Sequence, residues 1–174
     1  GMDAEGFSGE DGRTTIFDYW SVDTIRRWRN NGKFDNKQLT ADELSLQSYY
    51  AKVLNICNSS EAVREGEFYD LMYVNPQLQR QYAFVRHTEN ETLLIVANFA
   101  AHDAEVSIQV PQHLFEYYQS EESTSNDWMD LLTGDSVKAS FTSAEATKLN
   151  VPAWGGCVLR MKEQKKTKCK KSKA

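Results

Sequence analysis

The chain has 174 residues, enough for one ordinary domain with an extension or for two small units. An apolar content of 40 % and a charged content of 26 % are typical of a soluble globular protein, and no apolar run approaches the ~18 residues that a membrane helix needs. The net charge of −5 combines a lysine-rich end of the chain with a body that is more acidic than the total suggests. Because the acidic body repels polyanions, we expect neither nucleic acid nor membrane as a partner.

The cysteines and histidines give no metal or disulfide pattern. Cys57, Cys157 and Cys169 are odd in number and lack a C-x-x-C spacing, and the histidines have no partner at ligand spacing, so we expect no metal site and no cofactor. Cys57 and Cys157 fall at apolar positions and are predicted to be buried. No basic start precedes an apolar stretch, which favours a cytoplasmic location over a secreted one.

The first 36 residues form an irregular zone that is rich in aromatic side chains. DGRTTIFDYW, residues 11–20, carries three rings beside a polar head. A short helix is predicted over Val22–Asn30, with Ser21 as its cap and Asn31-Gly32 as its stop. So much apolar surface near the start of the chain suggests a partner surface that covers it.

A long amphipathic helix is predicted over Thr40–Asn58. Thr40 and Glu43 form a T-x-x-E capping box, in which each side chain satisfies a backbone N–H of the other residue. Apolar residues then recur at steps of three and four, at Leu46, Tyr50, Val53, Leu54 and Cys57. This single stripe is expected to lie on another surface.

From Glu67 onward the apolar pattern changes to a period of two, which indicates strands. The predicted strand segments are 68–74, 81–88, 92–99, 106–110, 128–132, 137–141 and 151–161, the last of them bent at Gly155-Gly156. About seven short strands separated by turns predict an antiparallel Greek-key β-sandwich. Trp128 and Trp154 are both predicted to lie in strands and to fill its core. The polar segment 119–127 is predicted to be a mobile loop.

The order of several strings along the chain resembles the end of an α-amylase-type glycoside hydrolase. The strings are DGRTTIFDYW, SVDTIRRW, KFDN and YYAKVLNICNSSEAVREGEFYDLMYVN, followed by LLIVANF, DWMDLLTG and VPAWGGCVLRM. In that family, strings like the last three recur in this order in the C-terminal sandwich. The match covers residues 3–162, nearly the whole chain.

The resemblance implies a division into three parts. Residues 1–62 would be a remnant of the catalytic (β/α)8 barrel, residues 63–162 the C-terminal sandwich, and residues 163–174 a disordered lysine-rich tail. The residues expected to face the missing barrel are Phe17, Tyr19, Trp20, Ile25, Trp28 and Phe34. Without that barrel, the same zone is expected to form a homodimer or to be poorly ordered.

The resemblance also implies that this chain is inactive alone. Retaining glycosidases use two carboxylates, and the family holds them in motifs around Asp, Glu and an NHD-like triplet that are absent here. The implied function is therefore a non-catalytic domain that packs against the barrel of an enzyme acting on α-glucans, and stabilises it. The alternative is a carbohydrate-binding module that contacts α-glucan through surface aromatics, with Tyr117 and Tyr118 as candidates.

Overall fold

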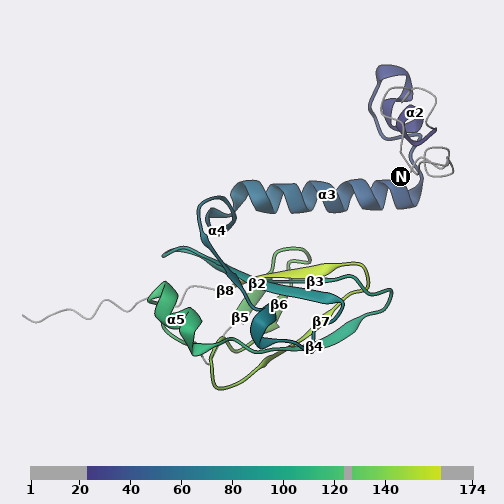
Figure 1. The fold of residues 1–174 in the computed structure, drawn as a ribbon. Helices are drawn as coiled ribbons and strands as arrows, with labels where there is room; N and C mark the ends of the chain where they lie inside the picture. Colours follow the sequence, from purple (N-terminus) through teal and green to yellow (C-terminus); the bar gives the residue numbers. More distant parts are fainter. Residues whose placement is uncertain (1–22, 124–126, 162–174) are drawn as a thin grey trace, which may run out of the picture. The chain divides into compact units, whose positions relative to one another are not determined.

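The structure is a computed structural model that describes residues 23–123 and 127–161 (Figure 1). The chain divides into two compact units, residues 1–54 and residues 55–174. Element labels follow Figure 1. Among the described residues, no helix has the length and apolar character needed to span a membrane.

The described part of the first unit is helical. Helix α2 covers Asp23–Arg29, and a short 3-10 turn, η1, covers Asn30–Gly32. The long helix α3 covers Ala41–Ser59. The predicted capping box is present, because the Thr40 N–H donates to Glu43 Oε2 at 2.9 Å and the Glu43 N–H donates to Thr40 Oγ1 at 3.3 Å. Arg27 of α2 also donates to Glu43. This bond and the Thr40 N–H lower the pKa of Glu43 to about 2.

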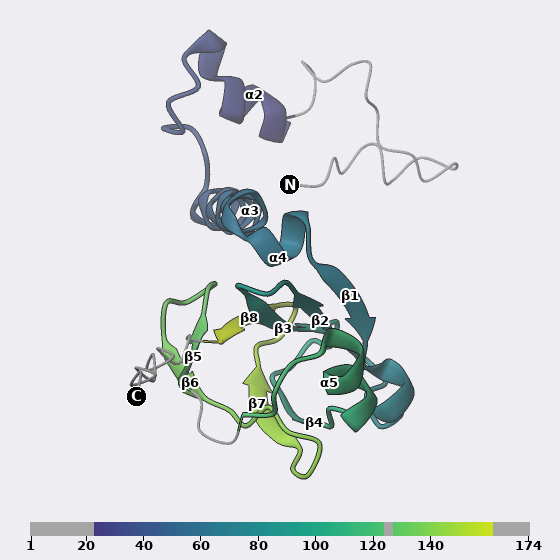
Figure 2. The same cartoon turned by 90° about the vertical axis from the view of Figure 1, so that its left-hand side faces the viewer.

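The second unit is mainly antiparallel β-structure in two sheets, which Figures 1 and 2 show as layers with the short helix α5 at one end. One sheet has six strands in the order β1-β2-β3-β8-β5-β6, and the other pairs β4 with β7. The strands are β1 Glu67–Asp70, β2 Gln81–His87, β3 Thr92–Asn98, β4 Ala104–Ile108, β5 Asp127–Asp130, β6 Ser136–Lys138, β7 Thr147–Val151 and β8 Gly156–Met161.

The described chain crosses between the two sheets four times, from β3 to β4, from β4 to β5, from β6 to β7 and from β7 to β8. The chain leaves β3, forms β4 in the second sheet, and later returns from β7 to β8, which pairs with β3. The first and the last of these crossings lie side by side, and the buried amide of Asn98 links them. The predicted mainly-β sandwich class is therefore confirmed, with eight described strands in place of about seven.

The core lies between the two sheets, and its side chains are predominantly apolar. Side chains from both sheets and from α5 meet there, as alternation along the strands requires. Trp128 is fully buried, donates its ring N–H to Ala139 O at 3.1 Å, and meets the Phe141 ring edge-on at 5.4 Å. The largest fully buried side chains are Trp128, Phe141, Leu71, Leu93, Leu94, Ile108, Leu114, Leu159, Val85, Val96, Val110 and Val151.

Two sequence predictions at the end of the sandwich are wrong. The segment 151–161 is not one bent strand, because β7 ends at Val151 and β8 begins at Gly156 in the other sheet. Trp154 lies in the turn between them with 69 % of its surface exposed, so it is not part of the core. At Gly156 a Cβ atom would lie 2.8 Å from Val96 O, so only glycine lets β8 approach β3 at this point.

Two short elements were also missed by the strand pattern. Segment 68–74 is strand only as far as Asp70 and then forms the 3-10 turn η2, Met72–Val74. After Pro111 the chain forms helix α5, Gln112–Tyr118, which buries Leu114 and Phe115 against the sandwich. A seven-residue helix with two neighbouring aromatics has too little periodicity to be distinguished from a loop.

Hydrogen bonds connect a short helix, α4 (Glu61–Arg64), and its cap to the large sheet and the adjoining turn. Ser60 caps it and donates to Glu91 Oε2 at 2.6 Å, and the Ala62 N–H donates to the same oxygen at 2.9 Å. Arg86 of β2 donates to Ala62 O at 3.0 Å. Gly66 follows with no room for a side chain, because its Cβ would lie 2.4 Å from Ala62 O. Residues 60–66 are therefore an integral part of the second unit.

The two described cysteines differ in burial, which predicts different reactivity. Cys157 is buried as expected, whereas Cys57 is only half-buried. Burial, together with the nearby Asp130 carboxylate, raises the pKa of Cys157 to about 12, so this thiol is not ionised at pH 8. We expect maleimide at pH 8 to label Cys57 well before Cys157, with the sites mapped by peptide mass spectrometry. Equal labelling rates in the folded chain would contradict this assignment.

Candidate binding site: an aromatic hollow beside helix α5

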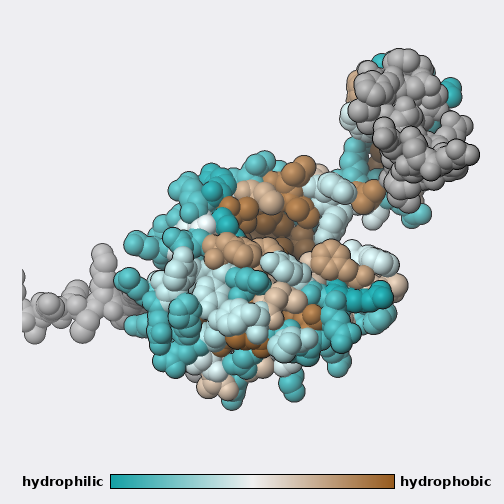
Figure 3. All heavy atoms as spheres, in the orientation of Figure 1, coloured by the Kyte–Doolittle hydropathy of each residue, from teal (hydrophilic) through white to brown (hydrophobic). Residues whose placement is uncertain are grey.

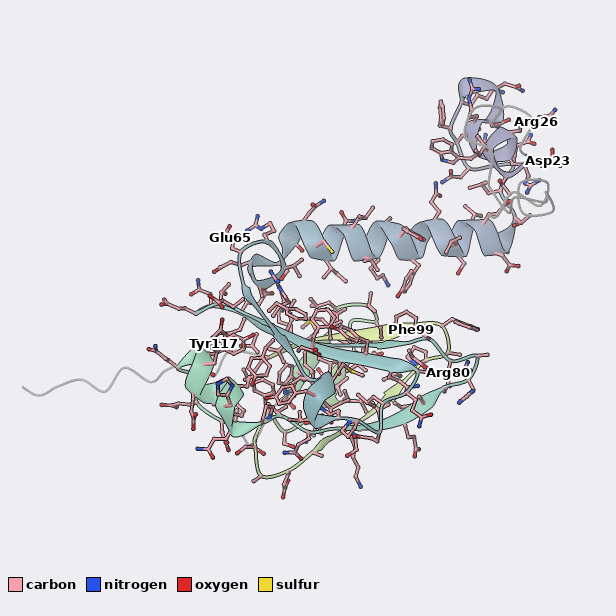
Figure 4. The ribbon with its side chains drawn as sticks, in the orientation of Figure 1. Asp23, Arg26, Glu65, Arg80, Phe99 and Tyr117 are labelled. Atoms are coloured by element: carbon pink, nitrogen blue, oxygen red, sulfur yellow. The ribbon has the colours of Figure 1, made fainter. Side chains whose placement is uncertain are left out.

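Helix α5 presents Tyr117 and His113 on one face, four residues apart. Leu114 and Phe115 fix the opposite face of α5 in the core, so this pair is directed toward strand β1 and turn η2. Figure 4 shows Tyr117 on α5 at the end of the sandwich. Tyr117 has 51 % of its surface exposed, so a large part of this side chain is open to solvent.

These two side chains line a shallow, open hollow of about 700 Å³. Strand β1 and turn η2 supply the remaining walls, so three elements from distant parts of the sequence build the site. The lining is mostly apolar ring surface with a few polar atoms, and it consists of Phe68, Tyr69, Asp70, Tyr73, His113 and Tyr117.

A chain of hydrogen bonds fixes the floor of the hollow. The hydroxyl of Tyr69, which is 9 % exposed, lies 2.8 Å from the Tyr73 hydroxyl and 2.8 Å from His113 Nδ1. Burial of Tyr69 raises the pKa of its hydroxyl, which therefore stays protonated. At the rim, the Tyr117 hydroxyl donates to the Glu67 carboxylate, and this bond raises the pKa of Tyr117. The rings are thus held in place before any ligand arrives.

The two sequence candidates on α5 occupy different environments. Tyr117 lines the hollow, whereas Tyr118 stacks on the His87 ring, with centroids 4.4 Å apart, and donates to Glu67 O at 3.2 Å. Burial lowers the pKa of His87 and raises that of Tyr118. Tyr118 therefore packs against the sheet and is half-buried, and Tyr117 is the more exposed of the two side chains.

The expected barrel-facing residues fall only partly within the described structure. Phe17, Tyr19 and Trp20 lie outside the described residues. Ile25 is half-buried on α2, and Trp28 and Phe34 meet edge to face with centroids 5.1 Å apart while remaining 45 % and 50 % exposed. The predicted homodimer and the predicted barrel contact both stay predictions.

Asp130 and Asp70 both accept hydrogen bonds from backbone N–H groups. Asp130 is buried and accepts the N–H groups of Leu132 and Val158 at 3.0 and 3.2 Å. Asp70 Oδ1 accepts the Met72 N–H at 2.9 Å at the start of η2. Within residues 23–123 and 127–161, no three His, Cys, Asp or Glu side chains gather in a way that could hold a metal ion.

Comparison of the fold with solved structures gives many matches, although no protein-family model and no curated protein sequence matches the chain. An α-amylase from Geobacillus thermoleovorans, solved with acarbose, matches over 76 % of this chain and 26 % of its own, with a TM-score of 0.51 and 16 % identity. AmyP, solved with maltose, matches over 70 % of this chain and 21 % of its own, with a TM-score of 0.52 and 14 % identity. The chain has the fold of part of an α-amylase.

The likeness to α-amylases is one of fold, because sequence identity is low. This chain spans about a quarter or less of the two solved proteins named above. The part it matches is therefore a minor portion of each. The resemblance that the sequence strings indicate and the likeness of the folds agree on the same family.

Proposed function

We propose that this chain is the non-catalytic C-terminal domain of an α-amylase-like enzyme acting on α-glucans, and that it packs against the catalytic part and stabilises it. The observation that carries this proposal is an apolar outer face on the six-stranded sheet. The match to only part of each α-amylase supports it. The hydrolytic carboxylates would lie in another part of the parent enzyme, so we expect no release of reducing sugar by this chain alone.

The outer face of the large sheet carries apolar side chains where a solvent-exposed face would carry polar ones. In register across β2, β3 and β8, Phe84 lies opposite Ile95, and Ile95 lies opposite Val158, all of them half-buried. The next row toward the end of the sheet is Tyr82, Ala97 and Gly156. An antiparallel sheet with one wet face alternates apolar and polar residues, as β4 does with Glu105 and Ser107 pointing outward.

Helix α3 also exposes apolar side chains where a solvent-exposed surface would carry polar ones. Its nineteen residues include none that is buried, and its large apolar side chains remain open to solvent. These are Leu44, Leu46, Tyr49, Tyr50 and Leu54, with exposures from 37 % to 62 %. Figure 3 shows apolar residues, coloured brown, gathered within a mostly hydrophilic surface. A helix gains most of its stability from packing an amphipathic face, so α3 is expected to be covered in the parent enzyme.

The test compares one substitution in two contexts, this chain and the parent enzyme encoded by the reading frame that contains it. Ile95→Thr keeps a β-branched side chain but adds a hydroxyl to the outer face of the sheet. We expect a change in unfolding free energy within about 0.5 kcal/mol in the chain alone and a loss of about 1–3 kcal/mol in the parent, where the hydroxyl becomes buried without a partner.

Asn150→Thr is the control, because Asn150 is exposed on the outer face of the small sheet. It is expected to have the same small effect in both contexts. Thermal melts of both variants in both contexts supply the four values. An Ile95→Thr effect of equal size in the chain and in the parent would count against the proposed packing.

A further inference from the structure

We propose that the aromatic hollow beside α5 is a binding site for a pyranose ring of a neutral saccharide, with Tyr73 and Tyr117 as the stacking residues and Asp70 as a hydrogen-bond acceptor. This inference goes beyond the packing function, because it assigns a ligand to a different surface. It also selects one of the two tyrosines that the sequence offers as carbohydrate contacts, because Tyr117 and not Tyr118 lines the hollow.

The ring surfaces suit the C–H faces of a sugar. Tyr73 and Tyr117 expose 61 % and 51 % of their surfaces, and Phe68 at the margin exposes 47 %. Aromatic rings combine a large apolar face with a polar tip in tyrosine, which matches a pyranose, whose faces are apolar and whose edges carry hydroxyl groups. The open shape of the hollow admits a ring that belongs to a longer chain.

The polar atoms around the rings suit hydroxyl groups. Asp70 accepts one bond, from the Met72 N–H on Oδ1, and in the described part of the chain its Oδ2 has no hydrogen-bond partner. The Tyr73 hydroxyl and the His113 ring can each donate or accept, as sugar hydroxyls can. An apolar protein side chain placed in the hollow would bury these groups without partners, which is unfavourable.

The fixed rings reduce the entropy cost of binding. Tyr117 is held by its bond to Glu67, and Tyr73 is held through Tyr69 to His113. A side chain that is already immobilised loses little rotamer freedom when a ligand arrives. The hollow is therefore preformed in the free protein, as small-molecule sites usually are.

The test titrates the full 174-residue chain separately with maltoheptaose, cellotetraose and choline, followed by amide NMR shifts. We expect saturable shifts near the hollow with at least one of the two saccharides in the millimolar range, and weaker or no binding of choline. Tyr73→Ala and Tyr117→Ala are each expected to weaken saccharide binding about fivefold to tenfold. Asp70→Asn is expected to weaken it less, because an amide oxygen still accepts.

Tyr50→Ala is the matched control, because Tyr50 on α3 is 62 % exposed, nearly the same as Tyr73, and lies outside the hollow. This variant is expected to bind as the unchanged chain does. Amide spectra of each variant verify that it is folded. The proposal is overturned by any of three results: no saturation with either saccharide, saccharide binding that both tyrosine variants retain, or tighter binding of choline, which would indicate a cation site.

Discussion

Replacing Trp128 by alanine should destabilise the second unit by about 3–5 kcal/mol, because it removes a fully buried ring from between the two sheets. The loss includes the hydrogen bond from its ring N–H to Ala139 O and the edge-on contact with Phe141. Trp128→Phe keeps much of the volume but leaves Ala139 O without its donor, so about 1–3 kcal/mol should be lost. Urea denaturation monitored by circular dichroism measures both values.

Trp154→Ala is the control for this series. The sequence alone predicts that both tryptophans lie in the core, yet Trp154 is 69 % exposed in the turn between β7 and β8. Its removal should change the unfolding free energy by no more than about 0.5 kcal/mol. Similar losses for the two alanine variants would show that the assigned burial is wrong.

Asn98→Ala is expected to cost about 3 kcal/mol, because Asn98 joins the crossing from β3 to β4 with the crossing from β7 to β8. Its side chain is 2 % exposed and its Nδ2 lies 2.9 to 3.2 Å from the carbonyl oxygens of His102, Val151 and Pro152. Its Oδ1 accepts the Ala100 N–H at 3.0 Å. Alanine leaves these backbone groups without a partner, and buried groups in that state are costly.

Asn98→Asp separates the donor role from the volume of the side chain. The carboxylate retains the acceptor but replaces the amide donor with an oxygen facing carbonyl oxygens, so the loss should equal or exceed that of Asn98→Ala at pH 7. Asn150→Ala, at an exposed position on β7, should have almost no effect. A loss below about 1 kcal/mol for both Asn98 variants would contradict the role assigned to this amide. The same urea midpoints supply the comparison.

The sequence predicts most correctly where the determining contacts are local. The capping box of Thr40 and Glu43 forms as expected, because both partners lie within one helical turn. Strands β2 and β3 also match the predicted segments 81–88 and 92–99, since apolar residues of strand-forming type flank a short polar connection. Helix α5 was missed, because only its docking on the sandwich through Leu114 and Phe115 distinguishes it from a loop.

The binding hollow shows why one candidate could be found and the site could not. Tyr117 was recognised as a surface aromatic beside a polar loop, but its companions Tyr69 and Tyr73 are more than forty residues away in the sequence. They meet only because α5 folds back on β1, where His113 reaches the Tyr69 hydroxyl. No pattern along the chain specifies that contact.

By itself the sequence determined the mainly-β class, the capped helix and the resemblance to α-amylases, because periodicity, caps and ordered strings are read along the chain. Tertiary structure alone decided that Val151 and Gly156 belong to different sheets, that Trp154 is exposed, and that Tyr117 rather than Tyr118 faces the hollow. The physical reason is that burial and pairing depend on neighbours in space. Those neighbours are set by how the sheets cross and where α5 packs.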